Sequence, residues 1–184
     1  MEKKITTYFN FMPKELYKKI YDKSRKINWT INPHLDGKYS NHLTHQMIDT
    51  DLNKNKLKQP YKQLVKFISE KINRNIFPHN MYYNLYQHGN ECGIHVDRNT
   101  VNTNLTCVIY LTDNWSADWH GQTNFYSDDE TKIICSSIPY PNHAVIFDSS
   151  IKHGVSPISK NCYKDRIILV LQLDIKKNEE KGKR

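Results

Sequence analysis

Two stretches decide the interpretation of this chain: Ile94-His95-Val96-Asp97 and, further along, Ile151-Lys152-His153-Gly154-Val155. In an extended strand, residues i and i+2 point to the same face, so His95 and Asp97 place an imidazole beside a carboxylate. A second imidazole from a separate strand, that of His153, completes two histidines and one carboxylate with open positions opposite. This set is typical of non-haem Fe(II) and oxygen activation, whereas structural zinc prefers four closed ligands.

The composition predicts an ordinary globular protein. Of the 184 residues, 38 % are hydrophobic and 25 % are charged, which is enough for one domain with its own core. No apolar run approaches the roughly 20 residues of a membrane span, and the N-terminus lacks the apolar core of a secretory signal. The four cysteines are scattered, which argues against a zinc ribbon and fits a reducing compartment. We therefore expect a single cytoplasmic domain over residues 1–184.

The net charge of +8 raises the hypothesis of nucleic-acid binding. Many of the excess lysines, however, fall on predicted helix faces and in the terminal segment 176–184. Solvated helix faces and a basic tail are the simpler explanation of this charge.

The order of the predicted elements gives the fold class. Apolar residues at helical spacing predict helices over about 14–26 and 60–75, and a hairpin or loop pair is expected over 29–45 with Asp36-Gly37 as its turn. After Pro78 the pattern changes to short strands, at 81–86, 105–112, 123–126, 132–137, 144–147, 153–157 and 166–173. We expect a mainly β chain with flanking helices (α+β). Its core would be a double-stranded β-helix, or jelly roll, with the two N-terminal helices packed on the outside of one sheet. Helical support would occupy residues 1–78, the β core 79–175 and a basic tail 176–184.

The C-terminal half resembles the Fe(II)/2-oxoglutarate-dependent dioxygenases, and among them most closely the prolyl 4-hydroxylase-type enzymes. The order and spacing of several pieces agree with that family. The pieces are Asn84-Leu-Tyr86-x-x-Gly89, His95-x-Asp97, Val108-Ile-Tyr110-Leu-Thr-Asp-Asn-Trp115, Asn142-His-Ala-Val-Ile-Phe147, His153-Gly-Val-Ser-Pro157 and Arg166-Ile-Ile-Leu169. The resemblance implies Fe(II) held by the residues at positions 95, 97 and 153. It also implies 2-oxoglutarate and O2 as cosubstrates, with ascorbate as a candidate additional ligand.

The cosubstrate adds a physical requirement of its own. One carboxylate of 2-oxoglutarate would lie inside an apolar barrel, where only a buried cation makes it tolerable. Arg166 stands where a polar loop enters an apolar strand, and its guanidinium offers a bidentate fork. The resemblance assigns this role to Arg166 and a hydrogen bond to the same carboxylate to Tyr110. It makes Tyr86 a pocket-lining residue, although both tyrosines could simply pack in the core.

The substrate is the part on which the sequence says least. The family commonly has Gly-Gly-Glu-Thr where this chain has His120-Gly121-Gln122-Thr123, so substrate contacts are expected to differ here. Related nucleic-acid demethylases carry a second arginine six residues after the first, and this chain has Gln172 there. Trp115 and Trp119 predict an aromatic rim suited to a proline ring, unless they pin their loop to the sheet. We expect hydroxylation of a prolyl residue in a peptide or protein, with release of succinate and CO2. The alternatives are oxidation of a nucleic-acid base or a small molecule, or a jelly-roll module that binds ligand without turnover.

Overall fold

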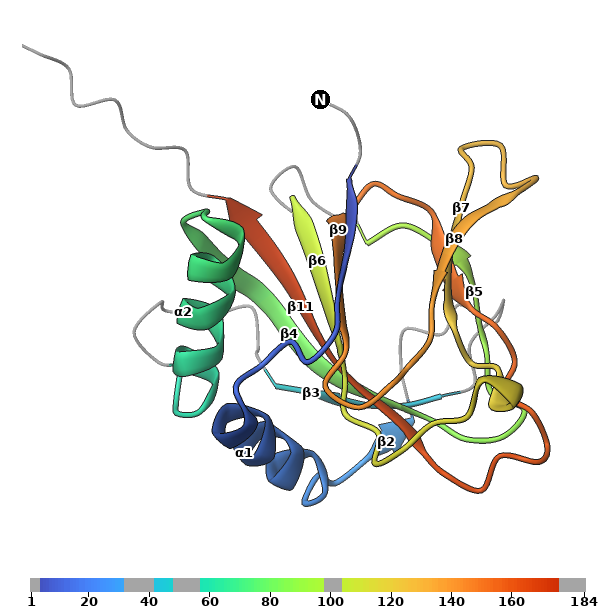
Figure 1. The fold of residues 1–184 in the computed structure, drawn as a ribbon, viewed down its shortest axis with the longest axis horizontal. Coiled ribbons are helices and arrows are strands. Elements are labelled where there is room, and N and C mark those ends of the chain that lie inside the picture. Colours follow the sequence, from blue (N-terminus) through green and yellow to red (C-terminus); the bar gives the residue numbers. More distant parts are fainter. Residues whose placement is uncertain (1–3, 32–41, 48–56, 98–103, 176–184) are drawn as a thin grey trace, which may run out of the picture.

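The computed structural model describes residues 4–31, 42–47, 57–97 and 104–175. The helices and strands follow one another along the chain as shown in Figure 1. They are β1 (Ile5–Tyr8), α1 (Lys14–Ser24), β2 (Thr30–Ile31), β3 (Leu43–Gln46), α2 (Tyr61–Ile72), β4 (Ile76–Tyr86), β5 (Cys92–His95), β6 (Leu105–Tyr110), the 3-10 turn η1 (Ala117–Trp119), β7 (Thr123–Tyr126), β8 (Ile133–Ser137), β9 (Ala144–Asp148), β10 (His153–Val155) and β11 (Arg166–Ile175).

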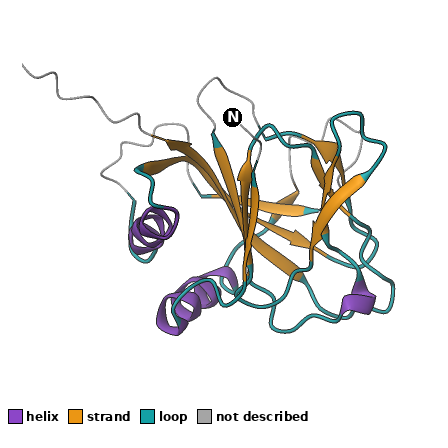
Figure 2. Ribbon diagram, turned by 45° about the horizontal axis from the view of Figure 1, so that its top comes forward, coloured by secondary structure: helices purple, strands orange, loops and turns teal. Residues whose placement is uncertain are grey.

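The strands form two antiparallel sheets. The larger has the order β1-β9-β6-β11-β4-β3-β2, and the smaller has the order β5-β10-β7-β8. From β4 onward the chain passes repeatedly between the two sheets, as from β4 to β5 and from β9 to β10, although β7 and β8 share the smaller sheet. This arrangement is the predicted double-stranded β-helix, with two helices added. Figure 2 shows both helices on the same side of the larger sheet, away from the smaller one.

The outer face of the larger sheet is covered by the two helices. Leu16 and Ile20 of α1 and Leu64 and Ile68 of α2 are buried at a spacing of four residues, so each helix has one apolar stripe. These stripes pack against alternate residues of the central strands, namely Met81, Tyr83, Leu85, Cys107, Ile109, Ile167, Leu169, Leu171 and Leu173. The prediction of two helices outside one sheet is confirmed.

The inner face of the larger sheet faces the smaller sheet. Its apolar residues, including Val108, Ile168 and Val170, share a second core with Phe125 of β7 and Val155 of β10. The register of β11 with β4 and β6 arranges this face in transverse rows. At one end Arg166 lies opposite Tyr86, and at the other Gln172 lies between Asn80 and Thr106.

The structure differs from the sequence prediction in the residue at which the first strand of the β core begins. β4 starts at Ile76 and continues through Pro78, although proline cannot donate to a strand ladder. An irregularity in the pairing opposite Gln172 and Leu173 accommodates it. Three strands from the N-terminal segment extend the larger sheet at both edges: β1 on one side, and β2 and β3, which pair with each other as the hairpin expected over 29–45, on the other. The Asp36-Gly37 turn and the tail lie outside the described residues.

Candidate active site

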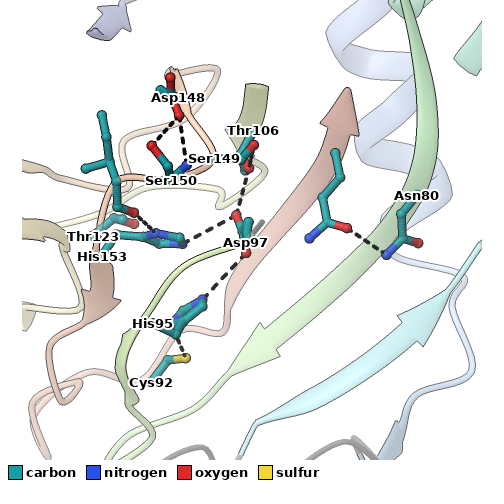
Figure 3. A network of polar contacts seen from close by, with 12 residues as sticks. Asn80, Cys92, His95, Asp97, Thr106, Thr123, Asp148, Ser149, Ser150 and His153 are labelled. Atoms are coloured by element: carbon teal, nitrogen blue, oxygen red, sulfur yellow. Dashed lines mark hydrogen bonds and ion pairs between the residues drawn. The ribbon is translucent and has the colours of Figure 1, made fainter. Parts of the chain in front are cut away.

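Three potential metal ligands meet between β5 and β10. His95 ends β5 and lies directly opposite His153, the first residue of β10. Asp97 follows β5 and brings its Oδ1 to 3.7 Å from His95 Nε2 and its Oδ2 to 3.5 Å from His153 Nε2. One ligand atom from each residue lies within 4.8 Å of the others. The structure therefore brings together the three residues that the sequence singled out (Figure 3).

Hydrogen bonds fix which ring nitrogen of each histidine faces this centre. His95 Nδ1 lies 2.8 Å from the Gly93 carbonyl oxygen, and His153 Nδ1 lies 3.0 Å from that of Ile151. A carbonyl only accepts, so each Nδ1 carries a proton and each Nε2 is the nitrogen that faces the metal-type centre. Thr106 Oγ1 donates to Asp97 Oδ2 at 2.8 Å and orients the carboxylate. Such outer contacts are typical of metal sites.

The two histidines differ in their surroundings. Burial lowers the pKa of His153, so its ring is neutral and ready to bind a cation. For His95, loss of water contact lowers the pKa, but Cys92, Asp97 and the Gly93 carbonyl outweigh it and raise the pKa to about 9. A metal ion that binds at neutral pH must displace the proton from His95 Nε2. The side chain of His95 is 41 % exposed, so the centre is open to solvent on this side.

A buried cation lies at the other end of the inner face. Arg166 is fully buried at the start of β11, and its Nη2 donates to Thr123 Oγ1 at 2.9 Å. Its Nε and Nη1 are buried without a hydrogen-bond partner. No carboxylate among the described residues forms an ion pair with it. A buried guanidinium with unused donors is costly, so this geometry fits an absent anion such as a carboxylate.

Thr123 belongs to this end of the site, and the sequence did not point to it. Its Oγ1 accepts from Tyr110 Oη at 2.8 Å and from Arg166 Nη2 at 2.9 Å. A hydroxyl has two lone pairs and one hydrogen, so the remaining O–H is available to another acceptor. The sequence signal that could have pointed to it is its place at the end of the segment His120-Gly121-Gln122-Thr123, where the family commonly has Gly-Gly-Glu-Thr. Tyr110 lies beside the guanidinium, whose Cζ lies 5.4 Å from the tyrosine ring, and its hydrogen bond to the cosubstrate stays a prediction.

His42 is a second residue that the sequence did not single out. Its ring stacks on Tyr86 with centroids 4.4 Å apart, and the Arg166 guanidinium lies over Tyr86 at 4.8 Å. Tyr86 therefore packs against His42 and Arg166. Such packing is the alternative to a pocket-lining role that the sequence left open. Burial, followed by the charges of Arg166 and His95, lowers the pKa of His42 to about 4.

This buried histidine predicts a loss of stability in mild acid. Below pH about 6.5 the unfolded chain takes up a proton at His42 that the folded chain refuses until pH about 4. We expect this residue alone to lower the free energy of unfolding by about 2–3 kcal/mol between pH 7 and 4.5. Urea unfolding of the wild type and of His42→Phe at both pH values measures it. A pH dependence that is unchanged in His42→Phe would contradict the assignment.

Of the two tryptophans expected at an aromatic rim, Trp115 is buried and Trp119 is partly exposed. Trp115 is 6 % exposed, and its Nε1 donates to the His120 carbonyl at 2.9 Å. Its ring also packs against Gly121, where an added Cβ would lie 3.2 Å from Trp115 and 3.5 Å from Arg166. Trp119 is half-buried and touches Trp115 edge to face. Trp115 thus pins the loop through its buried indole, which is the alternative to a rim that the sequence left open.

Comparison with known proteins identifies the family. A model of the 2OG-Fe(II) oxygenase superfamily matches residues 81–172, half of the chain. The chain belongs to this superfamily. The matched region of this oxygenase includes all three potential metal ligands, Arg166 and Tyr110. His42 lies outside it. A search of curated protein sequences finds no match.

Solved structures share the fold of this oxygenase over nearly its whole length. A Pseudomonas putida prolyl-4-hydroxylase superposes with a TM-score of 0.68 at 15 % identity, covering 94 % of this chain and 93 % of the other. A Trichoplax adhaerens prolyl hydroxylase, in complex with a hypoxia inducible factor oxygen degradation domain peptide fragment, gives 0.69 at 17 % identity, with 92 % and 83 % covered. The viral collagen prolyl hydroxylase of Paramecium Bursaria Chlorella virus-1 gives 0.64 at 12 % identity, with 92 % and 94 % covered. The fold is that of the prolyl hydroxylases.

Family membership also bears on class and cofactors. The protein is an enzyme of the 2OG-Fe(II) oxygenase class, which implies Fe(II), 2-oxoglutarate and O2. Among the described residues, no helix is both long and apolar enough to cross a bilayer.

Proposed function

We propose that this oxygenase hydroxylates a C–H bond of a peptidyl substrate, with proline as the preferred residue. His95, Asp97 and His153 would hold Fe(II), and Arg166 would hold the far carboxylate of 2-oxoglutarate. When bound, Fe(II), 2-oxoglutarate and O2 supply the oxidising chemistry that turns C–H into C–OH and yields succinate and CO2. The observation that carries the proposal is the pairing of an open two-histidine, one-carboxylate centre with a buried arginine that lacks an anion.

The chain itself would bind, orient and exclude water. Arg166 supplies the charge and the fork for the carboxylate, while Thr123 offers its free O–H and orients the guanidinium. Tyr86, opposite Arg166, and Ile168, two residues along the same strand face, are buried and would exclude water from the cosubstrate. The proton on His95 Nε2 leaves when the metal binds. Binding of ascorbate stays a prediction.

A peptide is favoured because many of the described lysines lie away from the site. The exposed lysines of α1, among them Lys18, Lys19 and Lys23, lie on the helix that covers the outer face of the larger sheet. Within the described residues, the inner-face positions of β4, β6 and β11 carry one cation, the buried Arg166. Nucleic-acid affinity depends largely on cations that contact phosphates. The prolyl hydroxylases of similar fold, one of them solved with a peptide, also support this substrate class.

A substrate screen tests the proposal. The Fe(II)-loaded protein is incubated with 2-oxoglutarate and O2 against pools of peptides, oligonucleotides and amino acids. We expect succinate together with a gain of one oxygen in proline-containing peptides. Oxidised or demethylated nucleic acid, with no peptide gaining oxygen, would support the nucleic-acid alternative. Ligand binding without any succinate would support a module that does not turn over.

A further inference from the structure

A row of amide side chains crosses the inner face of the larger sheet at the end that holds Asp97. Gln172 of β11 pairs directly with Asn80 of β4 on one side and with Thr106 of β6 on the other. Asn80 Nδ2 donates to Gln172 Oε1 at 3.1 Å, and Gln46 of β3 donates to Asn80 Oδ1. We call Gln46, Asn80 and Gln172 the amide row. Figure 3 shows Asn80 on the strand beyond Asp97 and Thr106.

The register places this row next to the metal-type centre. Thr106 donates to Asp97 Oδ2 at 2.8 Å, and Gln172 is its cross-strand neighbour. Side chains directly opposite on neighbouring antiparallel strands have Cβ atoms about 4.5–5.5 Å apart. Gln172 therefore lies one side chain away from the group that orients Asp97. Arg166, six residues earlier on the same strand, lies at the opposite end of this face.

The amide row is not what a purely structural inner face requires. One step nearer to Arg166, the same three strands carry Val108, Val170 and Tyr82, which pack in the inner core. Gln172 is 6 % exposed, and a buried amide loses its hydrogen bonds to water, so it is retained at a cost unless each donor and acceptor finds a partner. Gln172 uses its Oε1 on Asn80, and its Nε2 makes no hydrogen bond to any other described residue. Two N–H donors thus remain beside the metal-type centre.

We infer that Gln172, held in place by Asn80 and Gln46, donates a hydrogen bond to a main-chain carbonyl of the substrate next to the oxidised residue. This inference rests on the proposed peptidyl function. A carboxamide N–H is a neutral donor, and a peptide carbonyl is a neutral acceptor with matching geometry. An amide can also contact the edge of adenine, but the inner-face positions of β4, β6 and β11 offer no exposed cation for the phosphates that would accompany it.

The test compares variants of nearly equal volume. Gln172→Met keeps the length of the side chain and removes its donors, and Gln63→Met on the exposed side of α2 is the matched control. With capped, uncharged proline-centred peptides, we expect the peptide KM of Gln172→Met to rise about tenfold, the worth of one lost hydrogen bond. The KM for 2-oxoglutarate and the Kd for Mn(II), used as a metal without turnover, should stay within about twofold of the wild type. Gln63→Met should match the wild type in all three.

A peptide series makes the result specific to a carbonyl. Each main-chain carbonyl is replaced in turn by a thioamide, a weaker acceptor. One position should weaken binding to the Mn(II)- and 2-oxoglutarate-loaded wild type, and the same change should have little further effect on Gln172→Met. A wild type with no sensitive position overturns the inference by itself, even if Gln172→Met unfolds.

Three results would overturn the inference. The first is a wild type that hydroxylates peptides but shows no sensitive thioamide position, or a folded Gln172→Met with an unchanged peptide KM. In that case the proposed peptidyl function would still stand. The second is a rise in the KM for 2-oxoglutarate or in the Kd for Mn(II) in place of the peptide KM, which would assign Gln172 to cosubstrate or metal. The third is a wild type that oxidises oligonucleotides and no peptide, in which case the proposed function fails as well.

Discussion

Replacement of His153 by Ala is expected to abolish succinate formation and to weaken Fe(II) binding by on the order of 100-fold or more, since even outer contacts of metal ligands are worth 10–100-fold. His153 is the buried member of the set and supplies one of only two imidazoles. Without it, His95 and Asp97 leave an incomplete ligand set on one short segment. Metal titration and succinate release measured on the same protein check both parts.

The control for this variant is His45→Ala. His45 lies on the outer-facing side of β3 and bonds the Asn28 carbonyl, far from the ligand set in the order of the sheet. It should retain both activities. Thermal unfolding of His153→Ala should stay cooperative, because the strand pairing of β10 with β7 does not depend on the imidazole. Succinate formed by His153→Ala at the rate of the wild type would place the metal elsewhere.

Replacement of Arg166 by Ala is expected to raise the KM for 2-oxoglutarate by about 100-fold or more, because removing one partner of a buried ion pair costs 3–5 kcal/mol. Arg166→Lys should recover only part of the loss, since an ammonium lacks the planar fork. The affinity for Fe(II) should change little, since the guanidinium lies at the other end of the inner face. Kinetics with varied 2-oxoglutarate at saturating Fe(II) measure the effect.

A second readout does not depend on turnover. 2-Oxoglutarate added with Mn(II) should raise the melting temperature of the wild type and not that of Arg166→Ala. Arg25→Ala is the matched control, because Arg25 also lies over a tyrosine ring, Tyr21, but on the exposed end of α1. An unchanged KM for 2-oxoglutarate in Arg166→Ala would remove the arginine from the cosubstrate site.

Local patterns in the sequence predicted most of the fold. The stripe spacing of Leu16 and Ile20 is a property of one helix, and it placed α1 within two residues of its observed end. The i, i+2 spacing of extended chain brought His95 and Asp97 together before their partner was known, although β5 ends at His95. The jelly roll followed from many short strands after two helices. These features depend on few residues close in sequence.

The features that sequence reasoning missed depend on pairing between distant segments. Thr123 joins Arg166 only because β7 and the start of β11 meet inside the barrel. His42 reaches Tyr86 because β3 adds to the edge of β4. The sequence could not decide between a rim and a loop anchor for Trp115, because an aromatic loop residue has the same local pattern whether its ring points outward or is buried. Register and loop packing decide such cases.

The two ends of the site rest on strands of very different length, and this has a consequence for local opening. β10 has three residues and its pairing with β5 is irregular, whereas β11 has ten residues and pairs with both β4 and β6. Local openings with few broken contacts are the most frequent. In amide hydrogen exchange, the backbone of β5 and β10 should therefore exchange well before that of β11. A ligand that contacts both Arg166 and the metal would connect the smaller sheet, which opens easily, to the larger sheet. Amide hydrogen exchange in β10 would then slow more than in any other strand.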